Sequence, residues 1–416
     1  MELRGRLGAL AERNFRLVFS STSISAFGDG VSTVALAFAV LHIDGSATAL
    51  GLVIGARQAA SAAITIAAGV WADRLPRHLV LVGAATVQGI VQALAGALVI
   101  SGRAEVWMLV VLSIGYGLAG GFVLPTSQGL IPAIVSAMRL QQANALLGLS
   151  RSVLEVVGPA IGGVLVAAGS PGGALLVDAA TFFAAAILLA RVTLSKRADH
   201  VEPEPFLDDV REGWKEFRRQ TWIWTTIVFF GIGNCAAAST YVLGPLVAKD
   251  HYSGASTWAW LVSSFAGGTI VGGVVALRFR PRRPLAASCI FTVPWILQPL
   301  GLALQLPVQI LVAISVFAGI GIAVHLALWF TVFQQQVPEE SRSRVSSYDS
   351  LFSFVLMPVG SAIAGPVSAA IGVSATLFAD FAIQVMCFGV IIGQPSVWAI
   401  RSGMGRRWEA GAEAAA

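Results

Sequence analysis

The sequence predicts an all-α membrane protein with twelve transmembrane helices arranged as two pseudo-symmetric six-helix bundles. Three observations predict this fold class: few charged residues, twelve long apolar runs, and an internal repeat of about half the chain. Of 416 residues, 56% are hydrophobic and only 12% are charged, whereas a soluble domain carries about 25% charged residues. Most of the surface must therefore face lipid, and we expect the chain to reside in a bilayer.

Each apolar run is long enough for a membrane helix, which needs roughly 20 residues. The runs are continuous rather than alternating, which excludes an outer-membrane barrel. The twelve predicted spans cover residues 15–41, 47–72, 79–101, 106–131, 141–169, 172–193, 222–248, 256–279, 284–304, 308–333, 343–371 and 373–398.

The placement of arginine and lysine predicts the orientation. If the N-terminus is cytoplasmic, the inner segments hold 23 of the 27 basic residues, the outer loops hold two, and two lie within spans. Cytoplasmic loops carry such an excess. We therefore expect a multi-pass protein of the cell (inner or plasma) membrane with both termini in the cytoplasm.

One connection is long and divides the chain. We expect an N-terminal bundle over residues 1–193, a cytoplasmic linker over 194–221 and a C-terminal bundle over 222–416. Within the linker, apolar residues recur at helical spacing with charges opposite, which predicts an interfacial helix on the inner leaflet. These residues are Phe206, Val210, Trp214 and Phe217. A solvated tether is the alternative.

The two halves are versions of one six-helix unit. A shift of 202 residues places Gly158–Gly163 over Gly360–Gly365 and Asp178 over Asp380. Parallel repeats related by an axis along the membrane normal are typical of transporters, with the substrate path between them. A shift of 205 pairs Asp29 with Asn234. Since the second half has lost this acid, ion coupling is expected in the first half.

Other classes of function are disfavoured. The net charge is +5, but the arginines lie in short loops rather than on one face, so no nucleic-acid partner is expected. Cys235, Cys289 and Cys387 lie in apolar segments and predict packing rather than a disulfide or metal site. No phosphate-binding loop, zinc motif or nucleophile elbow occurs, so we expect neither an enzyme nor a cofactor.

A short charged loop lies between the second and third spans. It is similar to the loop 2–3 signature of the major facilitator superfamily, G-x-x-x-D-R-x-G-R-[KR], but departs from it at Pro76 and His78. The matching residues are Gly69, Asp73, Arg74 and Arg77. The resemblance covers essentially the whole chain and implies a gating loop, in which Asp73 caps the eleventh span near residues 343–347 when the inner side is closed. A plain positively charged loop is the alternative.

Further motifs resemble the exporting members of this superfamily. Gly158, Pro159, Gly162 and Gly163 on the fifth span are similar to its antiporter motif, whose glycines let helices approach closely. Ordinary packing against the eighth span is the alternative. Gly28-Asp29-Gly30 and Asp178–Phe182 resemble the branch that includes the enterobactin exporter and the macrolide efflux proteins. This resemblance implies export.

Ionisable groups inside hydrocarbon are costly, so each is a candidate for ion coupling or substrate contact. Asp29 could carry a proton or hydrogen-bond a neighbouring helix, and Arg57 could be its counter-ion or a substrate contact. Arg151 and Glu155 share one helix face and can pair, either as a switch or statically. His325 could titrate or pack. Asp178 and Asp380 favour a structural role. A minority of seven aromatic residues is expected to line a hydrophobic cavity, and the candidates are Phe27, Phe38, Tyr116, Phe230, Tyr241, Trp329 and Phe330.

The leading hypothesis is a monomeric secondary transporter that exports a hydrophobic or amphipathic small molecule, such as a drug, antibiotic or siderophore, by proton antiport with alternating access. The expected partners are this substrate, protons and the lipid bilayer. A proton-coupled importer of the same fold and a non-transporting membrane sensor or scaffold are the alternatives.

Overall fold

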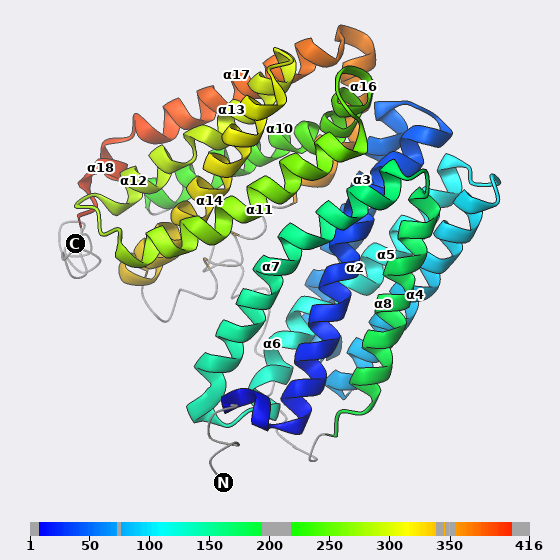
Figure 1. Ribbon diagram of the computed structural model, residues 1–416. Helices are drawn as coiled ribbons and strands as arrows, with labels where there is room; N and C mark the ends of the chain where they lie inside the picture. The colour runs from blue at the N-terminus through cyan, green and yellow to red at the C-terminus, as the bar shows by residue number, and fades with distance from the viewer. Residues whose placement is uncertain are drawn as a thin grey trace. The chain divides into compact units, whose positions relative to one another are not determined.

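The computed structural model describes residues 8–72, 76–193, 220–337 and 355–401, together with Arg218, Val345 and Asp349. In these segments the chain forms helices and short turns, without a strand (Figure 1). Eleven helices of the described chain are long and apolar enough to cross a membrane, and Met357–Ile371 is a shorter apolar helix. The predicted all-α membrane fold is confirmed. The interfacial helix expected in the linker lies outside the described residues.

The chain divides into two compact units. Unit 1 comprises Met1–Arg197, Val242–Ala266 and Ser361–Ala369, and unit 2 comprises Ala198–Tyr241, Gly267–Gly360 and Ala370–Ala416. The expected boundaries at residues 193 and 222 stay a prediction.

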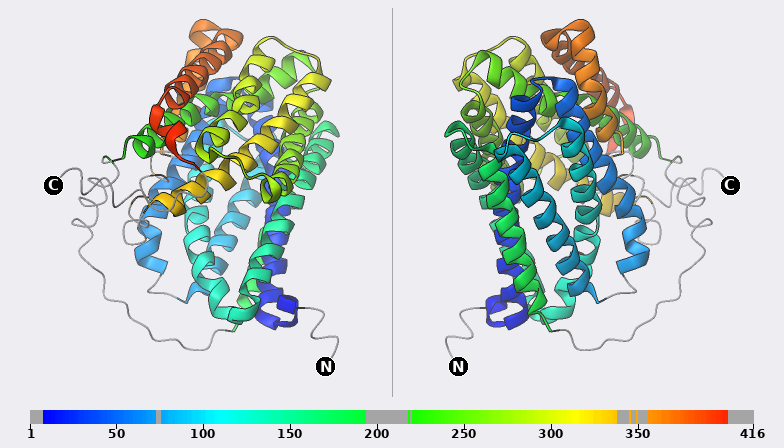
Figure 2. Two further views of the ribbon diagram at one scale, coloured as in Figure 1. Left: turned by 90° about the vertical axis from the view of Figure 1, so that its left-hand side faces the viewer. Right: turned by 90° about the vertical axis from the view of Figure 1, so that its right-hand side faces the viewer.

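Unit 1 contains the first six spans. Its helices are α2 (Arg13–Ile43), α3 (Ala47–Ala72), α4 (Arg77–Ile100), α5 (Val106–Gly121), α6 (Val123–Ile134), α7 (Leu140–Ala167) and α8 (Pro171–Ala190), with the 3-10 turns η1 (Gly8–Ala11) and η2 (Ala137–Arg139). Helix α2 packs against both α7 and α8, α4 packs against α8, and α3 packs against α5 (Figures 1 and 2). The tight turns after α4 and α7 use Gly102 and Gly169 at φ of 66° and 85°, a conformation that glycine adopts without strain.

Unit 2 contains most of the later spans. The helices from residue 221 onward are α10 (Thr221–His251), α11 (Ala255–Arg278), α12 (Pro284–Phe291), α13 (Val293–Ala303), α14 (Val308–Gln336), α16 (Met357–Ile371), α17 (Val373–Ile392) and α18 (Pro395–Ala399). Helices α10, α11 and α16 contribute residues to both units. Helix α14 packs against α12 and α13, and α13 packs against α17.

Two predicted spans are interrupted. The span expected over 106–131 breaks at Phe122 into α5 and α6, and the span over 284–304 breaks at Thr292 into α12 and α13. A proline follows each break, Pro125 and Pro294. Proline has no backbone N–H, and its ring clashes with the carbonyl four residues earlier, which interrupts the helical hydrogen bonds at these points.

Candidate ion-coupling site

Asp29 lies on α2 where two other helices approach its backbone closely. A Cβ atom on Gly30 would lie 2.8 Å from the Cα of Gly158 on α7. A Cβ atom on Gly28 would overlap the side chains of Asp178 and Thr181 on α8. The glycines on either side of Asp29 therefore hold this acid between α7 and α8, because small residues let helix backbones meet.

The antiporter-like motif forms the α7 side of this crossing. A Cβ atom on Gly158 would lie 2.7 Å from the Cα of Gly30, and one on Gly162 would lie 3.0 Å from the Cα of Val31. Pro159 lies within α7 beside Gly30. Gly163 meets the eighth span, at Ala259 of α11. The expected alternative of packing against the eighth span thus holds for Gly163, whereas Gly158 and Gly162 pack against the helix that carries Asp29.

Asp29 forms an ion pair with Arg57 of α3. The distance from Arg57 Nη2 to Asp29 Oδ1 is 3.6 Å, and Tyr116 of α5 donates its hydroxyl hydrogen to the same carboxylate oxygen. The Arg57 guanidinium carbon lies 3.7 Å from the centroid of the Tyr116 ring, a cation–π contact. The Asp29 and Arg57 side chains remain 45% and 29% exposed, whereas Tyr116 is buried. The pairing expected between Asp29 and Arg57 is present, and its role in transport stays a prediction.

Asp178 of α8 is fully buried and lies against α2 at Gly28, the residue before Asp29. It accepts hydrogen bonds from Gln92 Nε2 of α4 and from Thr181 Oγ1, the latter at 3.4 Å. Its neighbour across α2 is Asp29, and within the described chain no ion pair involves Asp178. A buried carboxyl group without a cation at its side is costly unless it carries a proton or is well hydrogen-bonded.

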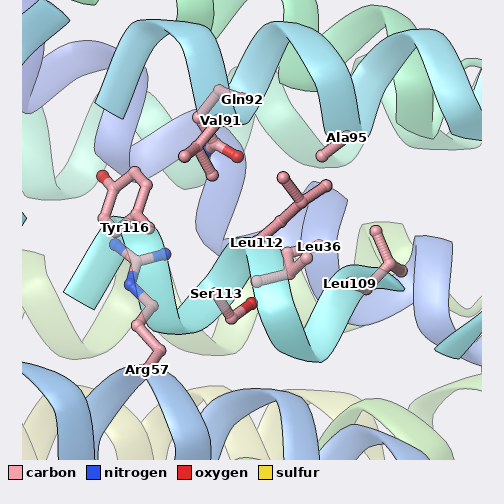
Figure 3. A pocket seen from close by; sticks show the side chains of 9 residues that line it. All are labelled: Leu36, Arg57, Val91, Gln92, Ala95, Leu109, Leu112, Ser113 and Tyr116. Carbon is pink, nitrogen blue, oxygen red and sulfur yellow. The ribbon is translucent and has the colours of Figure 1, made fainter. Parts of the chain in front are cut away.

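A small pocket lies between Arg57, Tyr116 and Gln92 (Figure 3). In the figure the Arg57 guanidinium lies against the Tyr116 ring, while Gln92 lies across the pocket from Arg57. Its remaining lining is Leu36, Val91, Ala95, Leu109, Leu112 and Ser113. The free volume of about 10 Å³ is room for about one water molecule. Such a water would lie between the polar groups that bond Asp29 and those that bond Asp178.

Arg151 and Glu155 pair along one face of α7, as their spacing predicts. The distance from Arg151 Nε to Glu155 Oε1 is 2.8 Å, and the two side chains are 71% and 47% exposed. With Asp29, Arg57 and Asp178 they make three acids and two bases. One proton therefore balances the charge of these five groups.

His325 is a packed residue of unit 2. It is 3% exposed, its Nδ1 lies 2.8 Å from the Ser288 hydroxyl oxygen, and its ring stacks on Phe230 with centroids 4.5 Å apart. This geometry matches the packing alternative of the two that the sequence left open. A role in coupling has no support from these contacts.

Asp380, the repeat counterpart of Asp178, is also buried but differently surrounded. It accepts hydrogen bonds from Ser239 at 2.7 Å, Thr240 at 3.0 Å and Gln384 at 2.6 Å. Gly360, the counterpart of Gly158, meets the backbone of Cys235 on α10. The packing of the repeat is thus kept in unit 2, while the position of Asp29 is taken by Asn234.

The gating loop is described only at its ends. Gly69 lies within α3, and Arg77 is the first residue of α4. Asp73 and Arg74 lie outside the described residues, as does most of the expected cap at 343–347. The gating role stays a prediction.

Sequence reasoning missed one residue that lines this site. It weighed ionisable residues and therefore passed over Gln92, an amide in the middle of an apolar span. It favoured a structural role for Asp178, and the role of that residue in transport stays a prediction. The signal was available, since a buried polar side chain requires a partner, and Gln92 and Asp178 are each other's partner.

The chain is similar in sequence to proteins that are named as efflux proteins. The multidrug efflux pump Tap of Mycobacterium tuberculosis is 25% identical over 402 residues, which cover 90% of this chain and 91% of that protein. Macrolide efflux protein A of Streptococcus pyogenes is 21% identical over 366 residues, covering 86% of this chain and 90% of that protein.

Solved structures share the fold. An inward-facing, unoccupied bacterial homologue of the human lysosomal transporter Spinster superposes with a TM-score of 0.70 at 17% identity, covering 93% of this chain and 98% of that one. The nucleoside transporter NupG, as its D323A mutant, gives a TM-score of 0.74 at 13% identity over 91% and 99% of the two chains. The sequence model of the Major Facilitator Superfamily matches residues 18–365. The chain is therefore a multi-pass membrane transporter that belongs to the major facilitator superfamily.

Proposed function

We propose that this transporter exports a hydrophobic or amphipathic small molecule in exchange for protons, and that the coupling site is the group Asp29, Arg57, Tyr116 and Asp178. The observation that carries the proposal is the juxtaposition of two carboxyl groups with one arginine inside unit 1. The relatives named as efflux proteins support export, and macrolides are the first substrate class to test.

The chemistry of coupling follows from charge balance. While Asp29 is ionised, it forms an ion pair with Arg57, and Tyr116 contacts both residues. A proton on Asp29 removes the attraction and leaves Arg57 without its counter-ion. Arg57 thus loses its ion-pair partner when Asp29 binds a proton and regains it when the proton leaves. The protonated and ionised forms of the protein therefore prefer different conformations. A ligand then shifts the equilibrium only as far as its affinity differs between them.

Asp178 supplies a second place for the proton. It lies against the backbone of α2 at the residue before Asp29. Its hydrogen-bond donor Gln92 lines a pocket with room for about one water molecule, and Arg57 and Tyr116 line the same pocket. A proton moved between the two carboxyl groups would keep the total charge constant while breaking or restoring the Asp29–Arg57 pair. We propose that Asp178 acts in this way rather than as a purely structural group.

The test is proton-driven uptake of radiolabelled erythromycin into inside-out membrane vesicles. An exporter loads such vesicles when their interior is made acidic, and Asp29→Asn should lower the initial rate at least about tenfold. Asp44→Asn is the matched control, because Asp44 ends the same helix, is exposed and bonds only locally to Ser46.

The outcomes separate the alternatives. A proton-coupled importer would not accumulate the drug under the same gradient, and a membrane sensor would show no flux in either direction. Wild-type uptake by the Asp29→Asn protein would remove Asp29 from the coupling site. We also propose that the protein works as a monomer in the cell membrane, with both termini in the cytoplasm. The accessibility of terminal tags in intact cells can check the position of the termini.

A further inference from the structure

Unit 2 contains a pocket of its own, and it is larger than the one beside Arg57. Residues of α10, α13 and α17 line it, together with Cys289 of α12 and Thr292 at the break between α12 and α13. Its free volume is about 40 Å³, against about 10 Å³ for the pocket in unit 1. It can therefore hold a group of several heavy atoms rather than one water.

The lining is aromatic and carries no formal charge. Phe229, Phe230, Trp295 and Phe388 supply flat apolar surface. Among the described residues, those that line the pocket include no Asp, Glu, Lys, Arg or His. An ion entering it would lose its hydration without gaining a counter-charge, whereas an aromatic ring would gain offset or edge contacts with these side chains. The pocket thus favours an uncharged aromatic group.

One polar group can orient such a ligand. Gln384 is 4% exposed and lines the pocket, and its Nε2 donates to Asp380, which also accepts from Ser239 and Thr240. These bonds fix the amide. Its Oε1 is then the end left to accept a hydrogen bond. A buried acceptor of this kind selects a ligand that carries an N–H or O–H donor.

The pocket is open because a side chain is absent from its wall. Gly233 of α10 lines it, and a Cβ atom there would find no other atom within 4 Å. Glycine inside a helix is otherwise unfavourable, and here no backbone approach requires it. This position therefore offers a direct way to fill the pocket.

We infer that this pocket of unit 2 is a binding site for an uncharged aromatic group bearing one hydrogen-bond donor, presented by a small molecule dissolved in the membrane. The inference does not depend on the direction of transport or on proton coupling. It can therefore fail or stand separately from the proposed function.

The probe for the test is N-phenyl-1-naphthylamine, which is uncharged, aromatic and has one N–H donor. Its saturable binding to the purified protein is followed by energy transfer from tryptophan. Gly233→Leu should weaken binding at least about tenfold by filling the pocket. Gly273→Leu is the matched control, because Gly273 is exposed on α11 of the same unit and a Cβ atom there also meets nothing. Equal binding by the wild type and the Gly233→Leu protein would overturn the inference.

Two further measurements keep the inference testable if Gly233→Leu does not fold. Trp295→Leu adds no bulk and should weaken binding by about fivefold. Gln384→Met should weaken binding of the amine but not of 1-phenylnaphthalene, which lacks the donor. A tightly held lipid chain, seen by native mass spectrometry together with no probe binding, would also contradict the inference.

Discussion

Asp178 of unit 1 and Asp380 of unit 2 occupy corresponding positions in the repeat, and both are buried carboxyl groups bonded by a glutamine and by hydroxyl groups. They differ in what lies beside them. Asp178 adjoins Asp29 with its arginine and tyrosine, whereas the counterpart of Asp29 near Asp380 is the neutral Asn234. The repeat has thus kept one buried acid in each unit, and at the corresponding positions 29 and 234 only unit 1 carries a second acid.

The largest expected effect comes from moving the acid between the units. Asp29→Asn combined with Asn234→Asp keeps the residue composition but takes the acid away from Arg57 and Tyr116. We expect proton-driven erythromycin uptake to stay at least about tenfold below the wild type. Recovery of uptake would mean that either unit can couple, and the contrast between the units would be lost.

A second comparison uses the corresponding acids. Asp178→Asn should lower proton-driven uptake as Asp29→Asn does, because the proton loses its second site. Asp380→Asn should cost about 1–3 kcal/mol of stability, since an amide NH₂ then faces hydrogen-bond donors, but should leave the dependence of uptake on the proton gradient unchanged. Uptake rates and melting temperatures of both proteins check this. Equal loss of coupling in both variants would contradict it.

The glycine crossing allows a test of packing. Gly158→Leu places a side chain against the backbone of Gly30, where overpacking costs about 1–3 kcal/mol or more. Gly148→Leu, on the same helix, meets open space and should be neutral. Thermal unfolding of the purified proteins gives the difference. If the two variants have the same melting temperature, α2 and α7 do not pack as closely as their glycines indicate.

A smaller effect is expected at Tyr116. Tyr116→Phe keeps the ring against Arg57 and removes only the hydrogen bond from the hydroxyl group to Asp29. The ionised form of Asp29 should therefore lose about 1 kcal/mol of stabilisation. We expect the pH profile of uptake to shift while the maximal rate falls less than about fivefold. An unchanged pH profile would show that the Tyr116 hydroxyl does not affect the protonation of Asp29.

The smallest effect is expected at His325. His325→Gln removes the ring that stacks on Phe230 but introduces an amide that can form a hydrogen bond with Ser288 in place of the ring nitrogen. Stability should fall slightly, and the dependence of uptake on the proton gradient should remain. A changed proton dependence would place a coupling residue in unit 2.

Much of the fold was predictable because it follows from local composition. Apolar run length determines the spans, and the repeat follows from residue identities such as Gly158 over Gly360. The helix breaks at Phe122 and Thr292 were not predicted, although Pro125 and Pro294 could have indicated them. For the site, Asp29 and Arg57 stood out as charges in apolar runs. Their contacts with Tyr116, and the hydrogen bond between Gln92 and Asp178, depend on how α3, α4, α5 and α8 pack, which no spacing along one helix reveals.

We propose that protons are exchanged at Asp29 and Asp178 of unit 1. The most direct measurement is proton flux into proteoliposomes, reported by an enclosed pH-sensitive dye when an erythromycin gradient is imposed. We expect drug-driven proton movement in the wild type and the Asp380→Asn protein and none in the Asp29→Asn protein. Undiminished proton movement by the Asp29→Asn protein would contradict it.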